Sequence, residues 1–465
     1  MGVSEEEKKI ELLEQKIDLF ECAPVAKAVI SMSVPTVLSS LVVVLYNLAD
    51  TFFVGMLNQP VQNAAVTLAA PMMLAFNAIT NLFGVGSSGM MSRCLGKKDY
   101  DGVRNSSAFG IYCTIFSGLL YSLFFWLMRQ PLMILLGTSP ETMEATASYL
   151  GWTVGVGAIP AVLNVVLANQ VRAEGAALHA SIGTMSGCIL NILLDPVFIL
   201  PRGLNLGVAG AGMATFLSNC TACLYFFVLL KWKREHTYVS FHPSRLKFSR
   251  RIVGEVCSVG VPASIQNLLN VTSMMVMNNF VSPYGPDAVA AMGIAHKAYL
   301  IPVNIAMGIS HGIMPLVGYN FAADNRKRMK DIIFFAVKAA VCFLAVISIG
   351  YYIGAEGLIG LFMKKKEIIA YGGRFLRALC IGEVFLCIDF LAVGVFQSCK
   401  MGRTGLMFAL LRKVIMEIPA LFVLNRIWPL YGLPYALPLT ELVLAGAAVI
   451  CLRKLLKPER EGTQK

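Results

Sequence analysis

The sequence predicts an all-α polytopic membrane protein with twelve transmembrane helices in two six-helix halves. Hydrophobic residues make up 57% of the 465 residues and charged residues only 14%, whereas about 25% of a soluble domain is charged. Apolar residues run continuously rather than alternating, which excludes a β-barrel, and a weak internal repeat relates the two halves. The composition also excludes a disordered chain. Basic residues dispersed between apolar segments argue against a nucleic-acid partner, despite a net charge of +12.

The apolar segments are each long enough to cross a bilayer, which takes about 20 residues. Gly, Pro, Asn and charged residues separate them, as expected for turns. The predicted spans cover residues 29–55, 66–92, 106–128, 149–171, 180–200, 208–230, 252–282, 288–313, 332–354, 369–398, 405–425 and 433–455.

Residues 1–28 precede the first span and are predicted to form a cytoplasmic amphipathic segment. After a charged start, Ile10, Leu13, Ile17 and Phe20 recur at helical spacing, which is typical of a helix lying at the membrane surface. This segment does not have the pattern of a cleavable signal peptide.

The distribution of basic residues predicts that both termini lie in the cytoplasm. In that orientation the inner segments carry 29 Lys and Arg residues and the outer segments 8, in agreement with the positive-inside rule. The inner count includes Arg412 and Lys413, which are counted with the inner segment 399–413 although they also fall within the predicted span 405–425. An outer basic cluster is interpreted as a solvated loop, with a contact to lipid phosphates as the alternative; it comprises Lys364, Lys365, Lys366, Arg374 and Arg377.

The longest polar interruption divides the chain into two lobes. Residues 231–251 form a predicted cytoplasmic loop between a first lobe over 29–230 and a second lobe over 252–455, and a cytoplasmic tail covers 456–465.

The two lobes show a weak sequence repeat. At an offset of 227 residues, Val34-Pro35 aligns with Val261-Pro262, and Phe53-Val54 with Phe280-Val281. Because six spans is an even number, both halves start on the same side of the membrane and the repeats are parallel. Two such lobes around a central cavity are typical of an alternating-access transporter.

Ionisable residues inside the predicted spans are candidate functional residues, because a charge in hydrocarbon is expensive. Asp50 lies near the outer end of the first span and Asp195 near that of the fifth. Asn47 precedes Asp50 by three residues and Asn191 precedes Asp195 by four, so each pair shares a helix face. Two acids with amide neighbours could hold a proton or coordinate Na⁺; the alternative is that they only cap helix ends.

The second half carries further intramembrane charges. Lys297 is expected to pair with Glu383 or Asp389 of the tenth span, or to extend to the interface. Glu417 and Glu441 also lie within predicted spans, without a local signal for their role.

The seventh span has a polar face, which predicts either a cavity wall or contacts between helices. Amide side chains facing lipid would be costly, and Met side chains adapt to many ligand shapes. The candidate substrate-cavity residues are Asn47 and Asn164 in the first half and Gln266, Asn267, Asn270 and Met274 in the seventh span.

The sequence lacks the motifs of common membrane enzymes and ATP-driven pumps. It contains no HExxH or Walker A pattern, so an enzyme is not expected. Cys220 and Cys223 form a CxxC pattern inside an apolar run, without the context of a redox or zinc site. No cofactor is expected.

Several motifs resemble the multidrug and toxic compound extrusion (MATE) family. In the first half they are Tyr46-Asn-Leu-Ala-Asp50-Thr-Phe-Phe-Val-Gly after Pro35, Ser92-Arg-Cys-Leu-Gly96, and Arg172-Ala-Glu-Gly175 followed by Asn191-x3-Asp195-Pro-Val-Phe. In the second half, Phe396-Gln-Ser-Cys-Lys-Met-Gly and Arg412-Lys-Val-Ile-Met-Glu-Ile-Pro are similar to the prokaryotic MepA-like and DinF-like branch.

The resemblance implies a twelve-helix exporter whose lobes form a V around a central cavity. It implies cation coupling, by H⁺ or Na⁺, at Asp50, Asn191 and Asp195, where Na⁺ would be coordinated. Thr215 and Tyr149 are further implied members of this site. Pro35 matches a proline implicated in bending the first span. Other branches use an acidic residue in the seventh span, whose central and outer parts have only amides here.

The predicted function is therefore cation-coupled export of amphiphilic, often cationic drugs and toxic compounds by alternating access. We expect a monomer among membrane lipids in a bacterial or archaeal cytoplasmic membrane. One alternative is a flippase for lipid-linked oligosaccharides of the same superfamily, which would need a more cationic cavity. The other is a membrane-embedded receptor or enzyme.

Overall fold

The computed structural model describes residues 17–57, 59–234, 236–363 and 365–456, and within these ranges the chain is helical without a β-strand. The helices of the first lobe are α2 (Val25–Gly55), α3 (Pro60–Thr80), η1 (Asn81–Val85), α4 (Gly86–Gly96), α5 (Tyr100–Leu127), α6 (Arg129–Leu135), α7 (Pro140–Leu150), η2 (Gly151–Val156), α8 (Ala158–Ala173), α9 (Ala177–Ile199) and α10 (Gly207–Trp232). Those that follow are η3 (Pro243–Arg245) and, in the second lobe, α11 (Arg250–Val281), η4 (Ser282–Tyr284), α12 (Pro286–Ala322), α13 (Arg326–Phe362), α14 (Lys366–Ile381), α15 (Glu383–Ser398), α16 (Gly402–Leu410), η5 (Leu411–Glu417), α17 (Ile418–Ile427), η6 (Leu433–Tyr435) and α18 (Ala436–Leu455).

Helices cover all twelve predicted spans, and the predicted all-α membrane fold is confirmed. Within the described ranges, nine helical segments are long and apolar enough to cross a membrane alone. Two more qualify as bent pairs, Pro140–Val156 with Ala158–Ala173 at 52° and Lys366–Ile381 with Glu383–Ser398 at 47°. The remaining span, Gly402–Ile427, is helical but carries several charged residues.

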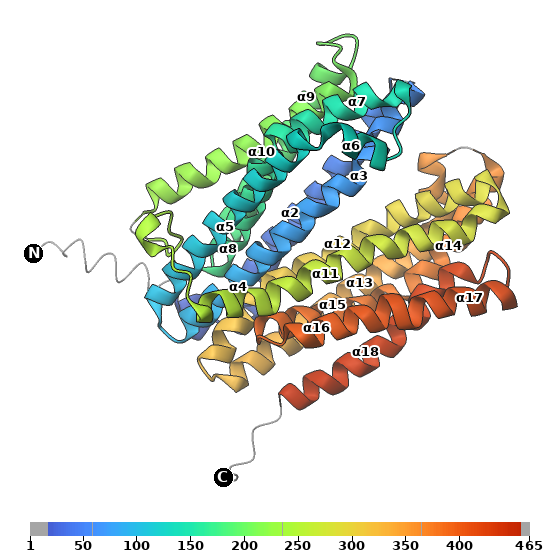
Figure 1. Cartoon of the computed structure of the whole chain (residues 1–465). Coiled ribbons are helices and arrows are strands. Elements are labelled where there is room, and N and C mark those ends of the chain that lie inside the picture. Colours follow the sequence, from blue (N-terminus) through green and yellow to red (C-terminus); the bar gives the residue numbers. More distant parts are fainter. Residues whose placement is uncertain (1–16, 58, 235, 364, 457–465) are drawn as a thin grey trace, which may run out of the picture.

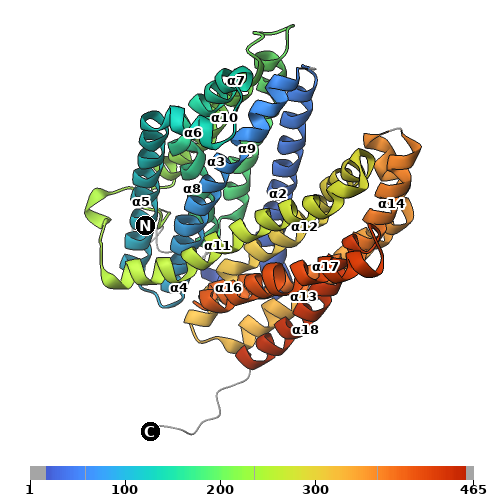
Figure 2. The same cartoon turned by 45° about the vertical axis from the view of Figure 1, so that its right-hand side comes forward.

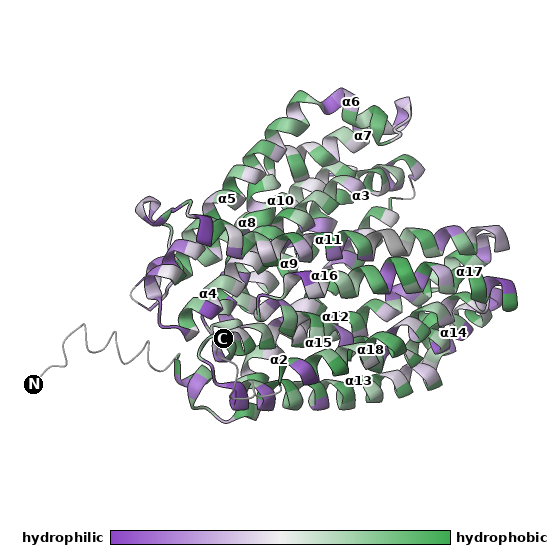
Figure 3. Cartoon of the chain, turned by 60° about the horizontal axis from the view of Figure 1, so that its bottom comes forward, coloured by the Kyte–Doolittle hydropathy of each residue, from purple (hydrophilic) through white to green (hydrophobic). Residues whose placement is uncertain are grey.

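The two lobes diverge from a common base to form a V (Figure 1 and Figure 2). We call the base the terminal end, because α2 starts and α18 finishes there, together with the α4–α5 and α12–α13 turns. The opposite side, which carries α6, α7 and the start of α14, is the open end. Hydrophilic residues concentrate in the turns of the terminal end, whereas the helix bodies are mostly hydrophobic (Figure 3).

The first helix of each lobe packs against the other lobe. α2 lies along α12, and α11 lies along α3, η1 and α4. Midway along α11, Ser264 donates to the carbonyl oxygen of Ala78 at 2.7 Å. At the terminal end Arg93 of α4 reaches the carbonyl oxygen of Ser398 and the carboxylate of Glu255, each at 3.4 Å. These contacts hold the two lobes together at the base of the V.

The turns after α4 and α12 share a local structure. Lys98 and Asp324 both have φ of +57°, an uncommon conformation for residues other than glycine. Asp99 then accepts from the backbone N–H of Gly102 at 2.9 Å, and Asn325 from that of Arg328 at 3.1 Å. Each acidic or amide side chain therefore caps the helix that follows.

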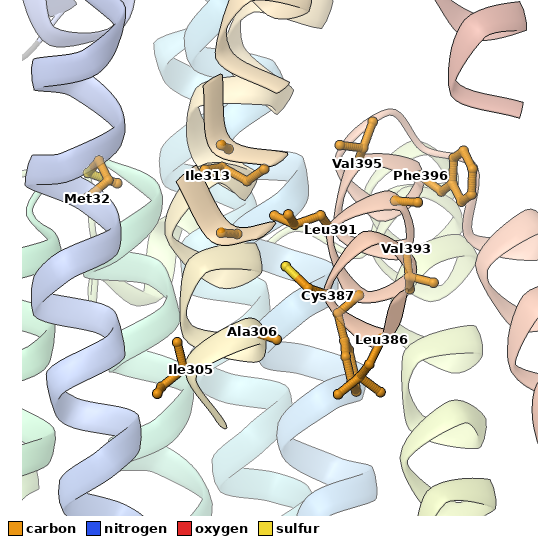
Figure 4. Close-up of a cluster of buried hydrophobic side chains, with 14 of the residues drawn as sticks. Met32, Ile305, Ala306, Ile313, Leu386, Cys387, Leu391, Val393, Val395 and Phe396 are labelled. Atoms are coloured by element: carbon orange, nitrogen blue, oxygen red, sulfur yellow. The ribbon is translucent and has the colours of Figure 1, made fainter. Parts of the chain in front are cut away.

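The second lobe is built around α12 and α15, whose apolar side chains face each other. Figure 4 shows Ile305, Ala306 and Ile313 of α12 beside Leu386 and other residues of α15. This buried contact fixes the position of α15 relative to α12.

The end of the N-terminal segment packs against the second lobe. The helical spacing of its apolar residues predicts only a helix at the membrane surface. Ile10 and Leu13 lie outside the described residues, but Phe20 is buried and stacks on Tyr319 with ring centroids 4.9 Å apart. Arg328 donates to the carbonyl oxygens of Phe20 and Ala23, each at 2.6 Å. The segment before α2 therefore joins the first lobe to the α12–α13 hairpin.

Candidate functional site

The candidate coupling residues lie on a buried polar face of α9. Its buried positions include Gly183, Gly187, Asn191 and Asp195, each four residues from the next, while Leu193 and other large apolar residues are exposed on the opposite face. The two glycines allow close approach to α10, since a Cβ at Gly187 would lie 3.0 Å from the carbonyl oxygen of Ser218. The polar face is thus turned away from lipid.

Asn191 and Asp195 form a hydrogen-bonded pair at the α9–α10 contact. Both side chains are buried, with exposed fractions of 1% and 0%. In the amide orientation that satisfies both groups, Asn191 Nδ2 donates to Asp195 Oδ2 at 3.0 Å, and Asn191 Oδ1 accepts from the Thr215 backbone N–H at 3.1 Å. The four-residue spacing thus places amide and carboxylate together, and Thr215 beside them.

Asp50 joins this cluster from α2. It lies close enough to Asp195 to interact electrostatically, and Tyr46 and Tyr149 lie within range of both carboxylates. Three separate helices, α2, α7 and α9, therefore bring together residues that are up to 149 positions apart (Tyr46 to Asp195). Tyr46 also lies beside Thr215 and was not among the predicted site residues, although it opens the motif that contains Asp50.

The first-lobe carboxylates have no basic partner among the described residues. Asp50 Oδ1 and Asp195 Oδ1 are both buried without a hydrogen bond, and no Lys or Arg of the described chain acts on either group. Buried unpaired charge is costly, so a proton or a small cation would stabilise this pair. The carboxylate and amide oxygens are suitable ligands for Na⁺ as well as for a proton.

Three of the predicted cavity residues line one cavity at the base of the V. Gln266, Asn267 and Asn270 face it from α11, together with Ala263. Residues of η1, α12 and α15 complete its wall: Asn81, Met307, Ser310, His311, Met314, Phe390, Val393, Gly394 and Gln397. Gln397 donates to Gln266 Oε1 at 3.1 Å. The polar face of the seventh span thus serves both as a cavity wall and as a helix contact.

The other predicted residues lie elsewhere. Asn164 is buried between α8 and α10, where its amide donates to Asn219 Oδ1 at 3.0 Å. Asn47 is exposed on α2, and Pro35 lies within the same helix, which runs on without a break. Met274 belongs to α11, but its side chain lies outside the described part of the structure.

Three of the second-lobe acids, Asp389, Glu417 and Glu441, are paired with basic residues of η5. Arg412 lies 2.6 Å from Glu441 of α18 and 3.7 Å from Asp389 of α15, and Lys413 lies 2.7 Å from Glu417. All five side chains are buried. The second lobe therefore carries its own counter-charges, unlike the Asp50–Asp195 pair.

The structure corrects one sequence-based assignment in this region. Arg412 and Lys413, which are counted above with the inner segments, lie buried in η5. Lys297 is exposed and forms no ion pair within the described ranges, so its alternative of pairing with Glu383 or Asp389 is not found there; Glu383 instead accepts from Ser348 Oγ at 2.7 Å. Local sequence cannot reveal these partners, because they come from helices distant in the chain.

The outer basic cluster is largely engaged by the protein itself. Lys365 donates to Asp287 Oδ2 at 2.6 Å, which raises the pKa of its ammonium group. Arg377 pairs with Glu356 at 3.0 Å, and Arg374 lies over the Tyr431 ring. Lys364 lies outside the described residues.

His311 is a cavity residue that the sequence reasoning missed. It lines the cavity of Gln266 and also the adjoining one that contains Arg172. The available signal was an ionisable side chain at the end of a predicted span, the criterion that selected Asp50.

No three His, Cys, Asp or Glu side chains of the described residues gather as a metal site, and the cysteines are free thiols.

Comparisons with known proteins agree on one family. The MatE family model matches residues 35–197 and again 262–423, so its two matches start 227 residues apart. Multidrug export protein MepA of Staphylococcus aureus (strain MSSA476) is 32% identical over 442 residues, covering 94% of this chain and 95% of its own length. MepA of Staphylococcus saprophyticus is 31% identical over 437 residues, with the same coverage. A solved outward-facing conformation of a multidrug resistance MATE family transporter has a similar fold, with a TM-score of 0.89, 23% identity and coverage of 98% of this chain and 99% of that one.

Proposed function

This chain belongs to the MATE family of multi-pass membrane transporters, and from that premise we propose that it exports amphiphilic, often cationic drugs and toxic compounds in exchange for H⁺ or Na⁺. The export activity is taken from the MepA relatives, which are named multidrug export proteins. The coupling is taken from the buried acids of the first lobe.

One observation carries the coupling proposal. Asp50 and Asp195 are neighbouring acids with buried, unpartnered oxygens and no basic residue of the described chain beside them. The second-lobe acids Asp389 and Glu441 have Arg412 as a counter-ion. A coupling ion is therefore needed to balance the charge of the first-lobe pair, and not that of the second-lobe cluster.

The V suggests how the coupling would work. We assign the terminal end to the cytoplasm, as the basic residues predict, so that this structure opens outward. Binding of H⁺ or Na⁺ at Asp50 and Asp195 neutralises the pair and weakens its attraction for a cationic substrate. Pro35 lacks the N–H that would close one turn of α2, so α2 is a suitable element to rearrange. The lobes then open at the terminal end, release the ion and rebind substrate.

Such a cycle requires the ion to bind the two conformations with different affinity. The contacts at the base of the V, such as Arg93 with Glu255, must be broken in the inward-open state. The protein is proposed to work as a monomer, because each chain supplies both lobes and the cavity.

Reconstituted protein tests the proposal. In liposomes, an imposed Na⁺ gradient or an imposed pH gradient should drive purified protein to transport ethidium in the direction opposite to the ion flow. The gradient that drives transport identifies the coupling ion. Flux that ignores both gradients would refute coupling.

Asp50→Asn tests the assigned site in the same assay. The variant should insert and purify normally but lose gradient-driven exchange, because it can no longer gain and lose a charge. Asp287→Asn is the matched control, since Asp287 forms an exposed pair with Lys365 at the open end. Normal exchange by Asp50→Asn would remove Asp50 from the site.

A further inference from the structure

The loop between the lobes forms one wall of a cavity at the terminal end. The cavity is lined by residues of α5, α10 and the loop that follows α10; Figure 1 shows where these elements lie in the first lobe. It is separate from the coupling site and from the cavities between the lobes. Its lining residues are Arg104, Phe227, Leu230, Lys231, Arg234, Thr237, Tyr238, Val239, Ser240, Phe241, His242, Pro243, Ser244 and Arg245.

The polar part of this cavity is strongly basic. Arg245 pairs with Asp101 at 2.6 Å, but Arg104, Lys231 and Arg234 form no ion pair with another described residue. Over the predicted loop 231–251 the sequence has seven Lys and Arg residues and one acid, Glu235, which lies outside the described residues. The cavity thus presents positive charge in excess of its acidic partners.

The other part of the cavity is apolar and continues into the lipid-facing surface of α10. Phe227 and Phe241 face each other with ring centroids 5.1 Å apart. On α10, Leu224 and Val228 are exposed by 61% and 57%, and Trp232 by 81%. Trp side chains are typical of the membrane–water interface, so the cavity lies where the hydrocarbon region ends.

The loop is held in place by hydrogen bonds to the helices. Tyr112 of α5 donates to the Phe241 carbonyl oxygen at 2.6 Å, and the Ser240 N–H donates to Ser107 Oγ at 3.1 Å. Glu174 accepts from the backbone N–H of Tyr238 at 2.8 Å. These bonds to α5 and the end of α8 make the cavity a preformed site.

We propose that this cavity binds an anionic phospholipid. Its phosphate lies among Arg104, Lys231 and Arg234, and an acyl chain runs along the exposed apolar face of α10. Basic cavities at the ends of membrane helices are suited to such headgroups, and each Lys or Arg near an anionic lipid surface contributes favourably. The hydroxyl of Ser240 is a further donor for the headgroup.

Lipid binding to the purified full-length protein tests this proposal. Phosphatidylglycerol in neutral detergent should raise the melting temperature, whereas phosphatidylcholine with the same acyl chains should not. Lys231→Gln/Arg234→Gln should raise the apparent Kd for phosphatidylglycerol by roughly thirty-fold, the factor that two such contacts supply. Lys247→Gln/Arg250→Gln removes the same charge from the same loop but outside the cavity, and should retain tight binding.

Several outcomes would overturn the proposal. They are equal stabilisation by phosphatidylcholine, an equal loss in both double variants, or an equal effect of soluble glycerol phosphate, which would make the ligand a free phosphate ester. Should the cavity variant not fold, wild-type protein decides the matter. A photoactivatable phosphatidylglycerol should crosslink to peptides of α5, α10 and residues 236–245, and crosslinks confined to other regions would refute the site.

Discussion

Arg412 forms an ion pair with Glu441 at 2.6 Å inside the second lobe, where the two side chains are only 7% and 1% exposed. Asp389 lies 3.7 Å from the same guanidinium group, and the Phe390 ring lies 5.0 Å from its carbon atom. The first lobe has no such internal pairing at Asp50 and Asp195 among the described residues. The two lobes share a sequence repeat, but the acids around Arg412 have a buried counter-ion, whereas the Asp50–Asp195 pair has none in the part of the chain that the structure describes.

Arg412→Met is expected to destabilise the protein strongly. Removal of one member of a buried ion pair leaves the other charge uncompensated, which costs about 3–5 kcal/mol. Thermal unfolding in detergent should show a large fall in the melting temperature. Arg412→Met/Glu441→Met should recover part of that loss. Arg377→Met, which breaks the more exposed pair with Glu356, should have a much smaller effect, and equal effects would refute the special role of Arg412.

Asp195→Asn is expected to abolish gradient-driven exchange as completely as Asp50→Asn. If the two acids act as one unit, the double variant should be no worse than either single variant, since effects within a unit are not additive. Initial rates of ethidium efflux from liposomes measure this. Two partial losses that multiply in the double variant would show that the acids act independently.

Gly260→Val is expected to weaken closure of the terminal end. A side chain at Gly260 of α11 would collide with the carbonyl oxygen of Leu82 in the first lobe, and overpacking of this kind typically costs about 1–3 kcal/mol. The closed base should therefore lose population by roughly ten- to a hundred-fold. Hydrogen–deuterium exchange should rise in α4 and the first turns of α11.

Gly254→Val is the control for this prediction. Gly254 lies on the same helix, but a Cβ there would meet no atom within 4 Å. Its exchange pattern should match that of the wild type. Comparable changes in both variants would indicate a loss of helix stability instead of separation of the lobes.

Arg328→Ala is expected to release the segment before α2 from the second lobe. The guanidinium group donates to the carbonyl oxygens of Leu19, Phe20 and Ala23, and hydrogen bonds to charged groups contribute about 1.5–3 kcal/mol each. Phe20 should then become accessible to chymotrypsin. Lys327→Ala removes a neighbouring exposed charge and should leave Phe20 protected; cleavage at equal rates would contradict the prediction.

Much of this architecture could be predicted from the sequence. Continuous apolar segments specify membrane helices, because each helix satisfies its own backbone hydrogen bonds in lipid. The four-residue spacing of Asn191 and Asp195 places both on one face of α9, and the structure shows them hydrogen-bonded. The periodicity within a single helix depends only on local geometry, and this is why these features could be predicted from the sequence.

Only the tertiary structure decided which helix faces meet. The buried position of Arg412, the exposure of Lys297, the place of Asn164 between α8 and α10, and the position of His311 between two cavities all depend on helices distant in the chain. A charged residue in an apolar run is recognisable in the sequence, but its partner is not. The partner lies on a helix distant in the chain, and no local sequence pattern identifies that helix. The sequence by itself therefore determined the membrane helices and the family, whereas packing between helices decided which acids are neutralised within the protein and which are left for a coupling ion.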